Sequence, residues 1–347
     1  MEHLHHFDLD LDPFQNEPDL RFYVDSVFHR GCQLRVERGL RQRKGLCVLT
    51  GKGGTGKTLL ARRILDSLEE EMFDANLMVM LAGAADAESV LMRFARQLGI
   101  DHPARDRSAL LAQVYERLAI VREDGRHCVL ILDDAQLLTP DGMAEVCGLA
   151  NLEYEERRLL SLLLVGHPEL AVALSQDPSL AARVDVRVKL SPLDLPSSND
   201  YLLHRLGVVG GPAGLFSESA IGALYKFSEG RPRLLNSLAD NALFEAYLEG
   251  KTQVESDHVE RCAADLGIAF DDDANRGWMK AGGSAREIGE LDLEMVAAGG
   301  DALPAFEASN SGAPASADVT HIDLAREMSQ VVDESEIDEL FVELIEE

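Results

Sequence analysis

Basic residues, paired cysteines and long apolar runs are all scarce in this 347-residue sequence. Lysine and arginine number 33 against 61 aspartate and glutamate, which gives a formal net charge of −28 and disfavours nucleic acid as a general partner. No run of about 18 apolar residues occurs, so the sequence predicts no membrane-spanning helix. Residues 1–12 are polar and acidic, and they predict no signal peptide.

The five cysteines form no C-x-x-C pair; they are Cys32, Cys47, Cys128, Cys147 and Cys262. Their odd number and wide spacing predict neither a disulfide framework nor a cysteine metal site, and they indicate a reducing cytosol. Cys47 and Cys128 stand inside apolar runs, where cysteine acts as a small hydrophobe. His3, His5 and His6 offer metal ligands, but a mobile polar N-terminus is the favoured interpretation.

The acidity is concentrated at the C-terminal end. Residues 271–347 contain 20 acidic and 4 basic residues, a net charge of −16, which leaves −12 for the other 270. Residues 269–320 are rich in glycine, alanine, serine and aspartate, and they predict a flexible, disordered acidic linker. Apolar residues at helical spacing predict a C-terminal amphipathic helix within 321–347; they are Ile337, Leu340, Phe341, Leu344 and Ile345.

Strand-like runs alternate with helical segments between residues 45 and 192. The runs cover 45–50, 76–82, 128–134, 159–166 and 184–190. Because several are continuously apolar, they predict an α/β fold with a parallel sheet covered on both faces. The helices between them are expected at 57–72, 86–100, 108–124 and 142–154.

The segments on either side of this α/β core have a different character. Residues 1–44 form a lead-in segment that ends in a helix. Residues 193–268 contain only helical patterns, and they predict a small all-helical lid domain. Two of its helices are expected to open with serine caps, at Ser197 and Ser217.

The sequence LTGKGGTGKT at 49–58 follows an apolar strand and opens a helix. It fits the phosphate-binding pattern G-x-x-x-x-G-K-[ST], in which glycines let backbone N–H groups approach phosphate oxygens. Lys57 is expected to pair with the β- and γ-phosphates, and the Thr58 hydroxyl to ligate Mg²⁺. The predicted cofactors are therefore ATP and Mg²⁺, contacted by Gly51, Lys52, Gly53, Gly54, Thr55, Gly56, Lys57 and Thr58.

A second motif, CVLILDDAQ at 128–136, ends an apolar strand in two aspartates. Asp133 is expected to hold Mg²⁺, mostly through water. Asp134 stands where a glutamate usually polarises the attacking water, so it is a candidate catalytic residue. Its side chain is one methylene shorter, and a misplacement of about 1 Å can cost about a hundredfold in rate.

Three further motifs contain candidate phosphate-sensing residues. His167 ends the next strand in LLLVGHPEL, from where it could touch the γ-phosphate or face solvent. Arg233 opens a lid helix in GRPRLL, where a cation is unfavourable unless an anion compensates it. Arg183 precedes the last strand, where an arginine finger acting on a neighbouring subunit is often found; Arg187 is a rival, and a plain surface arginine is the alternative.

Taken in order, these motifs resemble the AAA+ ATPases of the ExeA/GspA type. That group includes ATPases associated with type II secretion, mannose-sensitive pili and exopolysaccharide export. The resemblance covers roughly residues 11–268 and implies a P-loop core with a helical lid, ATP hydrolysis and nucleotide-dependent homo-oligomers such as rings. It assigns Lys57 and Thr58 to Walker A, Asp133 and Asp134 to Walker B, His167 to sensor 1, Arg233 to sensor 2 and Arg183 to the finger.

This sequence departs from that group at three places. Sensor 1 is usually glutamine there and is His167 here, and the Walker B pair is Asp-Asp rather than Asp-Glu. Both departures bear on the rate of hydrolysis more than on nucleotide binding. The membrane span and peptidoglycan-binding domain of the ExeA type are also replaced, by the acidic residues 269–347.

Two broad functions remain open from the sequence. The first is a cytoplasmic ATPase that serves a cell-envelope machine, is recruited to the inner membrane by its partners and binds a protein partner through the C-terminal helix. In the second, the chain is a DNA-associated regulator resembling transposition ATPases, with a basic patch that consists of Arg35, Arg38, Arg41, Arg43 and Lys44. The spelling KGGTGKT, with Lys52, also resembles ParA/MinD-type dimers, but the 50 residues before Gly51 and the GRPR-led lid disfavour that assignment.

Overall fold

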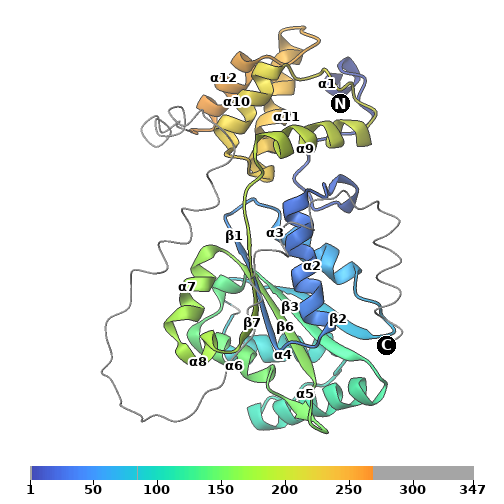
Figure 1. Ribbon diagram of the computed structural model, residues 1–347, viewed down its shortest axis with the longest axis vertical. Helices are drawn as coiled ribbons and strands as arrows, with labels where there is room; N and C mark the ends of the chain where they lie inside the picture. The colour runs from blue at the N-terminus through green and yellow to red at the C-terminus, as the bar shows by residue number, and fades with distance from the viewer. Residues whose placement is uncertain (1, 84, 269–347) are drawn as a thin grey trace, which may run out of the picture. The chain divides into compact units, whose positions relative to one another are not determined.

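The computed structural model describes residues 2–83 and 85–268 (Figure 1). The predicted linker at 269–320 and the predicted helix within 321–347 lie outside the described residues. None of the described helices is long and apolar enough to cross a membrane.

Five parallel strands form the central sheet, as predicted, but β2 covers 73–79 rather than the expected 76–82. Their order across the sheet is β2-β3-β6-β1-β7, with bounds Phe73–Val79, His127–Asp133, Leu160–Gly166, Leu46–Gly51 and Val184–Leu190. Because all strands run the same way, the segments that follow β1, β3 and β6 meet at one edge of the sheet. That edge is where an open parallel α/β sheet binds ligands.

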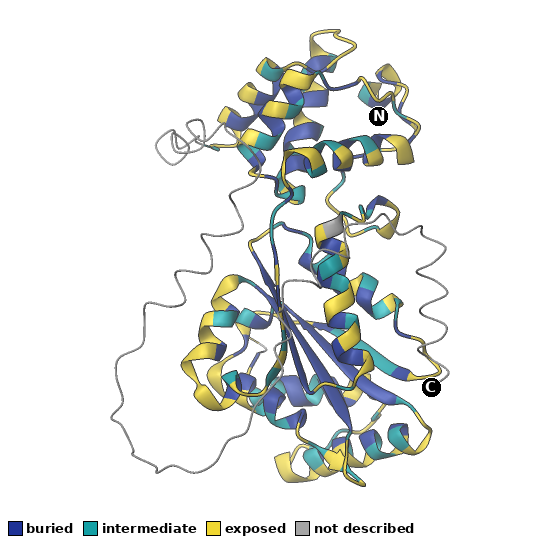
Figure 2. Cartoon of the chain, in the orientation of Figure 1, coloured by how far each residue is buried: buried dark blue, intermediate teal, exposed yellow. Residues whose placement is uncertain are grey.

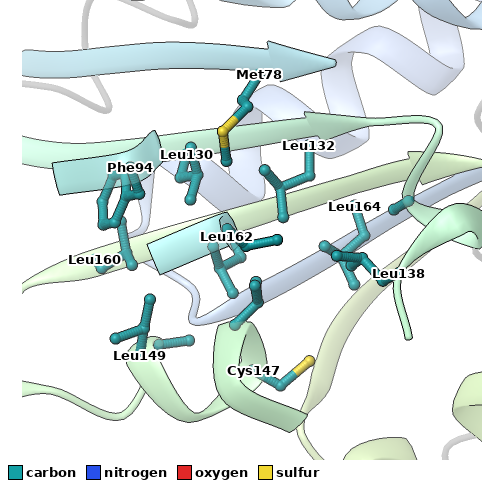
Figure 3. Packing of buried hydrophobic residues seen from close by; sticks show 14 of the residues in the cluster. Met78, Phe94, Leu130, Leu132, Leu138, Cys147, Leu149, Leu160, Leu162 and Leu164 are labelled. Carbon is teal, nitrogen blue, oxygen red and sulfur yellow. The ribbon is translucent and has the colours of Figure 1, made fainter. Parts of the chain in front are cut away.

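The central strands are buried on both faces, which explains their continuous apolar runs. In β3, Leu130 and Leu132 point into one hydrophobic cluster, while Val129 and Ile131 point into the other. Figure 3 shows the first cluster, and Figure 2 shows the strands in the colour of buried residues. Each fully buried leucine contributes about 1.5–3 kcal/mol.

Helices cover the two faces of the sheet. Residues of α2 (Val27–Arg41) and α3 (Lys57–Asp66) line one cluster. Those of α4 (Ala87–Gln97), α5 (Arg107–Glu123) and α6 (Pro140–Leu149) line the other. The two short helices that follow β6, α7 (Pro168–Gln176) and α8 (Pro178–Ala181), were not among the sequence predictions.

Two helices end earlier than the sequence predicted. α3 stops at Asp66 rather than at 72, because Phe73 already begins β2 by pairing with His127. α6 stops at Leu149, and the last two residues of the expected helix instead form β4 (Glu153–Tyr154), which pairs with β5 (Arg157–Arg158) in a hairpin. The hairpin turn has positive φ at both Glu155 and Glu156. Glycine or asparagine usually signals such a turn, and neither stands at these two positions.

The lid contains four helices: α9 (Leu195–Val208), α10 (Glu218–Ser228), α11 (Pro232–Leu248) and α12 (Ser256–Asp265). Ser217 caps α10 as expected. α9 begins before the expected cap at Ser197, because Asp194 accepts from the Ser197 backbone N–H and Pro196 occupies the first turn.

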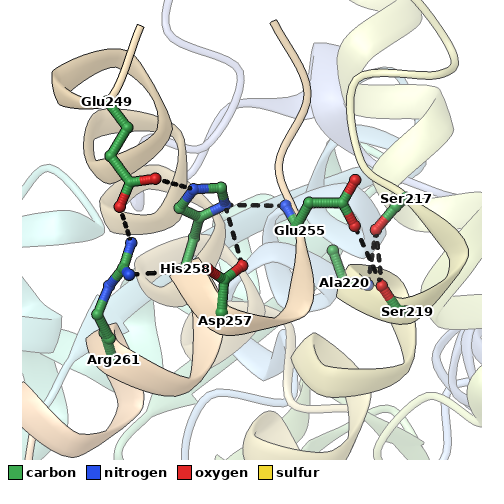
Figure 4. A network of polar contacts seen from close by, with 8 residues as sticks. All are labelled: Ser217, Ser219, Ala220, Glu249, Glu255, Asp257, His258 and Arg261. Atoms are coloured by element: carbon green, nitrogen blue, oxygen red, sulfur yellow. Dashed lines mark hydrogen bonds and ion pairs between the residues drawn. The ribbon is translucent and has the colours of Figure 1, made fainter. Parts of the chain in front are cut away.

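A polar network fixes the start of α12 (Figure 4). The buried His258 ring accepts from the Glu255 N–H at 2.9 Å through Nδ1, so its Nε2 donates to Glu249 at 3.2 Å. Arg261 forms an ion pair with the same Glu249 carboxylate at 2.5 Å. These contacts tie α12 to the end of α11.

The N-terminal segment packs against the lid, so the expectation of a mobile polar N-terminus is wrong for residues 2–12. It contains α1 (Glu2–His6) and a 3₁₀ turn, η1 (Leu20–Phe22). Its apolar side chains are buried in the lid cluster: Leu4, Phe7, Leu9, Phe14 and Phe22. The His3 and His6 rings make edge-to-face contacts with aromatic side chains of α11. Among the described residues, no group of three or more His, Cys, Asp or Glu side chains is arranged to hold a metal ion.

Candidate nucleotide-binding site

The glycine loop lies between the end of β1 at Gly51 and the start of α3 at Lys57. Gly54 and Gly56 have φ of +78° and +93°, a left-handed conformation that glycine adopts without steric cost. A Cβ on Gly51 would lie 2.7 Å from the Leu190 carbonyl oxygen, so this position also needs glycine. The backbone N–H groups of the loop therefore lie at the N-terminus of α3, a position that favours a bound anion.

Lys57 is buried at the base of this loop. Its Nζ donates to the Lys52 carbonyl oxygen at 3.0 Å, and the Thr55 hydroxyl donates to the same oxygen at 2.9 Å. Burial lowers the pKa of Lys57, while the charges of Asp133 and Asp134 oppose that shift. The ammonium group is thus held inside the loop, beside two carboxylates.

Thr58 and Asp133 come together as a candidate metal site. The Thr58 hydroxyl donates to Asp133 Oδ2 at 2.6 Å, and the Asp134 N–H donates to Oδ1 at 3.0 Å. Burial raises the pKa of Asp133, and the two donated hydrogen bonds partly offset this. A hydroxyl next to a buried carboxylate suits Mg²⁺, which prefers oxygen ligands, so these residues fit the predicted cofactor.

Asp134 lies at the start of η2 (Ala135–Leu137) in a left-handed conformation, with φ +55°. Gln136 Nε2 donates to its Oδ1 at 3.0 Å. The other end of the same carboxamide, Oε1, accepts from the His167 N–H at 3.0 Å. Sequence reasoning missed Gln136; the signal was a glutamine two positions after the Asp134 candidate.

His167 follows β6 and caps α7. A Cβ built on Gly53 would lie 3.7 Å from its Cε1 atom, so the imidazole lies over the glycine loop. The fold therefore brings His167, the sensor 1 candidate, next to the loop.

Arg233 joins the lid to the loop. Its N–H donates to the Gly54 carbonyl oxygen at 3.2 Å, and its side chain lines the pocket. Lys52 is mostly exposed and lies 3.8 Å from Glu229 of the lid, a contact that is weak in solvent. Its backbone carbonyl, rather than its ammonium group, holds Lys57.

These elements enclose a pocket of about 310 Å³, a volume in the range of small-molecule sites. The loop, Asp134, His167 and Arg233 line one part of it. The N-terminal segment 15–18 and the lid residues Tyr201, Arg205 and Asn236 line the rest. Sequence analysis predicted neither group of additional residues.

A chain of hydrogen bonds connects the lid to the N-terminal segment at this pocket. The buried Arg205 guanidinium donates to the carbonyl oxygens of Pro13 and Gln15 and to the Tyr201 hydroxyl. Tyr201 donates to Asn236 at 3.0 Å, and Asn236 donates to Asn16 at 3.2 Å. The pocket wall at 15–18 is thus fixed by lid side chains.

The two finger candidates lie elsewhere. Arg183 directly precedes β7, whose first residue pairs with Leu46 at the start of β1, so it lies at the opposite edge of the sheet from the loop. Arg187 lies within β7, and both arginines are exposed. Neither lines the pocket of its own chain.

The basic patch predicted near the lead-in helix is largely at the surface. Arg35, Arg38, Arg41 and Lys44 are exposed, and Arg43 is half-buried. Arg41 forms an ion pair with Glu69 at 2.7 Å.

Residues 40–174 match the family described as AAA domain. General secretion pathway protein A of Aeromonas hydrophila is 28% identical over 267 residues, which are 75% of this chain and 48% of that protein. This match confirms the resemblance to the ExeA/GspA type. An ORC1-type DNA replication protein of Cenarchaeum symbiosum (strain A) is 29% identical over 192 residues, 50% of this chain and 45% of that protein. The chain therefore spans about half the length of the curated relatives it matches.

Solved structures share the fold of most of this chain. Cdc6p from Pyrobaculum aerophilum aligns with a TM-score of 0.55 and 21% identity, covering 74% of this chain and 71% of that one. The Aeropyrum pernix ORC1 protein, solved in complex with DNA, gives a TM-score of 0.55 and 19% identity over 71% of this chain and 69% of that one. Together with the family match over residues 40–174, these likenesses confirm the predicted fold class, a parallel-sheet core with helices.

Proposed function

We propose that this protein binds ATP with Mg²⁺ and hydrolyses it, and that its nucleotide state controls its assembly. One observation carries the proposal. Lys57 and Thr58 of the loop and Arg233 of the lid line one pocket of about 310 Å³, and Asp133 lies directly behind Thr58, whose hydroxyl donates to it. This combination provides phosphate donors, a metal site and a cation on a separate domain.

In this proposal each residue has a separate role. The loop N–H groups and Lys57 hold the β- and γ-phosphates, and Thr58 and Asp133 hold Mg²⁺, which neutralises phosphate charge when bound. Asp134 orients the attacking water, and His167 contacts the γ-phosphate or that water. Arg233 reaches the phosphates from α11, so the lid follows the nucleotide state.

Arg183 fits a role in a neighbouring subunit. It is exposed and lies at the sheet edge opposite the loop, so it cannot serve the pocket of its own chain. In a homo-oligomeric ring, an arginine at this edge is available to the next subunit's nucleotide. Arg187, further along the same strand, is the alternative for this role.

Phosphate release and nucleotide binding test the proposal directly. Lys57→Ala should abolish ATP binding measured by calorimetry, whereas Arg96→Ala, an exposed α4 change, should leave it unchanged. Asp134→Asn should retain binding, lose phosphate release and accumulate ATP-dependent oligomers visible by light scattering. Wild-type protein that binds no ATP would refute the proposal.

The similarity to General secretion pathway protein A supports a role for this ATPase at the cell envelope. We place it in the cytoplasm, recruited to the inner membrane by partners, where it regulates a secretion, pilus or polysaccharide-export machine. In this proposal the acidic residues 321–347 bind a protein partner. Truncation after residue 320 should then remove partner capture while ATP hydrolysis is retained.

A DNA-associated role is the second candidate. Two observations favour it: the similarity to an ORC1-type DNA replication protein and the exposed cations Arg35, Arg38 and Lys44. A gel shift at low salt with ATP decides it. A shift that disappears in an Arg35→Ala/Arg38→Ala variant supports this role, and no shift rules it out.

A further inference from the structure

The carboxamide of Gln136 connects the ends of two strands at the candidate site. It donates from Nε2 to Asp134 Oδ1 at 3.0 Å and accepts at Oε1 from the His167 N–H at 3.0 Å. Asp134 follows β3 and His167 follows β6, which are neighbours in the sheet. A single side chain therefore links the candidate water-orienting carboxylate to the backbone of the candidate γ-phosphate sensor.

The partners fix the orientation of this carboxamide. A carboxylate only accepts hydrogen bonds and a backbone N–H only donates one, so NH₂ must face Asp134 and the oxygen must face His167. Exchanging the two ends would lose both bonds. The bridge thus has one geometry, and Asp134 receives a donor at one defined oxygen.

Gly166 leaves the room that this bridge needs. A Cβ at position 166 would lie 2.6 Å from Gln136 Oε1 and 2.9 Å from Leu170. Because φ of Gly166 is not in the left-handed region, the backbone itself does not require glycine there. The close approach of the Gln136 side chain is therefore a direct reason for glycine at this strand end.

Asp134 is a residue whose position needs support. It is not glycine, yet it has φ +55° and ψ +37°, a region that few side-chain-bearing residues adopt. Its N–H is held by Asp133 Oδ1 at 3.0 Å, which fixes the backbone but not the carboxylate. The contact that aims the carboxylate is the one from Gln136.

We propose that Gln136 is a positioning residue for ATP hydrolysis, which aims the Asp134 carboxylate and ties it to the end of β6. This inference rests on the proposed function. Contacts of a γ-phosphate with His167 would be transmitted through the carboxamide to Asp134, because both bonds share one rigid planar group. Gln136 itself does not line the pocket, so it acts on the reaction through Asp134.

Three variants test separate parts of the bridge. Gln136→Glu keeps an acceptor for the His167 N–H but replaces the donor by a second carboxylate facing Asp134. Gln136→Leu removes both bonds. Gly166→Ala leaves Gln136 intact and displaces its carboxamide. Gln97→Ala is the matched control, because that exposed glutamine donates only to the Leu77 carbonyl oxygen.

For each variant, kcat, KM, ATP affinity and melting temperature are measured on the full chain. Because a misplacement of about 1 Å costs about a hundredfold in rate, the Gln136 variants should lower kcat about 10- to 100-fold. KM and ATP affinity should stay within about twofold of the wild-type values. Gly166→Ala should lower kcat similarly, and the Gln136→Leu/Gly166→Ala double variant should be no worse than Gln136→Leu alone.

The outcomes separate this inference from the proposed function. If wild type releases phosphate, Asp134→Asn does not and Gln136→Glu matches wild type, the positioning role alone is wrong. A general loss of melting temperature, a KM increase equal to the kcat loss, or additive effects in the double variant would also overturn it. If wild type releases no phosphate, the proposed function and this inference fail together.

Discussion

The Arg205 guanidinium on α9 donates to the carbonyl oxygen of Gln15 at 2.9 Å, although 190 positions separate the two residues. Arg205 is only 4% exposed, and it also contacts the Tyr201 hydroxyl at 2.6 Å and the Phe22 ring at 4.4 Å. A lid arginine thus holds the N-terminal segment in the wall of the nucleotide pocket.

Replacing Arg205 by alanine should loosen this wall. The carbonyl groups of Pro13 and Gln15 would lose their donors, at a cost of about 1–3 kcal/mol for each that stays buried. We expect a lower melting temperature, weaker ATP binding and faster hydrogen exchange across residues 13–22. Arg205→Lys should recover part of the loss. Unchanged exchange across 13–22 would show that the guanidinium does not hold the segment.

Gly230 should tolerate no side chain. It has φ +68°, and a Cβ there would lie 1.8 Å from the Leu193 carbonyl oxygen. Gly230→Ala is therefore expected to destabilise the protein by more than about 1 kcal/mol, measured by denaturant unfolding. Gly222→Ala is the control: its Cβ meets nothing within 4 Å inside α10, so a gain of about 0.5–1 kcal/mol is expected.

His127 should make stability depend on pH below neutrality. Burial lowers its pKa from 6.5 to about 4, and its Nε2 lies 2.8 Å from the Ser161 hydroxyl. As pH falls from 6.5 towards 4, His127 becomes protonated in the unfolded chain but stays neutral in the folded chain. The free energy of unfolding therefore decreases across that window. A pKa difference of this size between the unfolded and the folded chain corresponds to about 3 kcal/mol of folding stability. Denaturant unfolding at several pH values should show that His127→Gln removes this part of the loss.

Asp133→Asn should separate stability from metal binding. Because burial raises the pKa of Asp133, the ionised carboxylate costs free energy in the fold, and a neutral amide removes that cost. We expect a higher melting temperature without nucleotide, together with loss of the added stabilisation by Mg²⁺ and ATP. Thermal melting with and without Mg²⁺–ATP measures both. A lower melting temperature without ligands would contradict this expectation.

The sheet and the glycine loop were predictable because their signals are local. β7 occupies the predicted residues 184–190, and the apolar runs of β1, β3 and β6 mark strands buried on both faces. The loop motif places Lys57 and Thr58 by spacing alone, since the chemistry requires glycines at fixed positions. Cys47 and Cys128 are buried within the strands as small hydrophobes, as predicted.

The remaining features depend on contacts between distant residues. Neither the Arg205 contacts nor the burial of Phe7 and Phe14 has a periodic signal, because their partners lie on lid helices roughly 200 positions later. The hairpin at 153–158 uses Glu155 and Glu156 in a turn that glycine normally marks. Gln136 connects Asp134 and the His167 backbone through one hydrogen bond to each, and sequence spacing does not reveal such a contact.

The burial of residues 2–22 in the lid cluster has a consequence for biosynthesis. The ribosome makes this segment before the lid helices, with the whole α/β core in between. At about 5–20 residues per second, Phe14 and Phe22 wait roughly 10–50 s for α12 to emerge. During that time their apolar side chains have no native partner, so this segment of the nascent chain stays exposed until synthesis of the lid is complete.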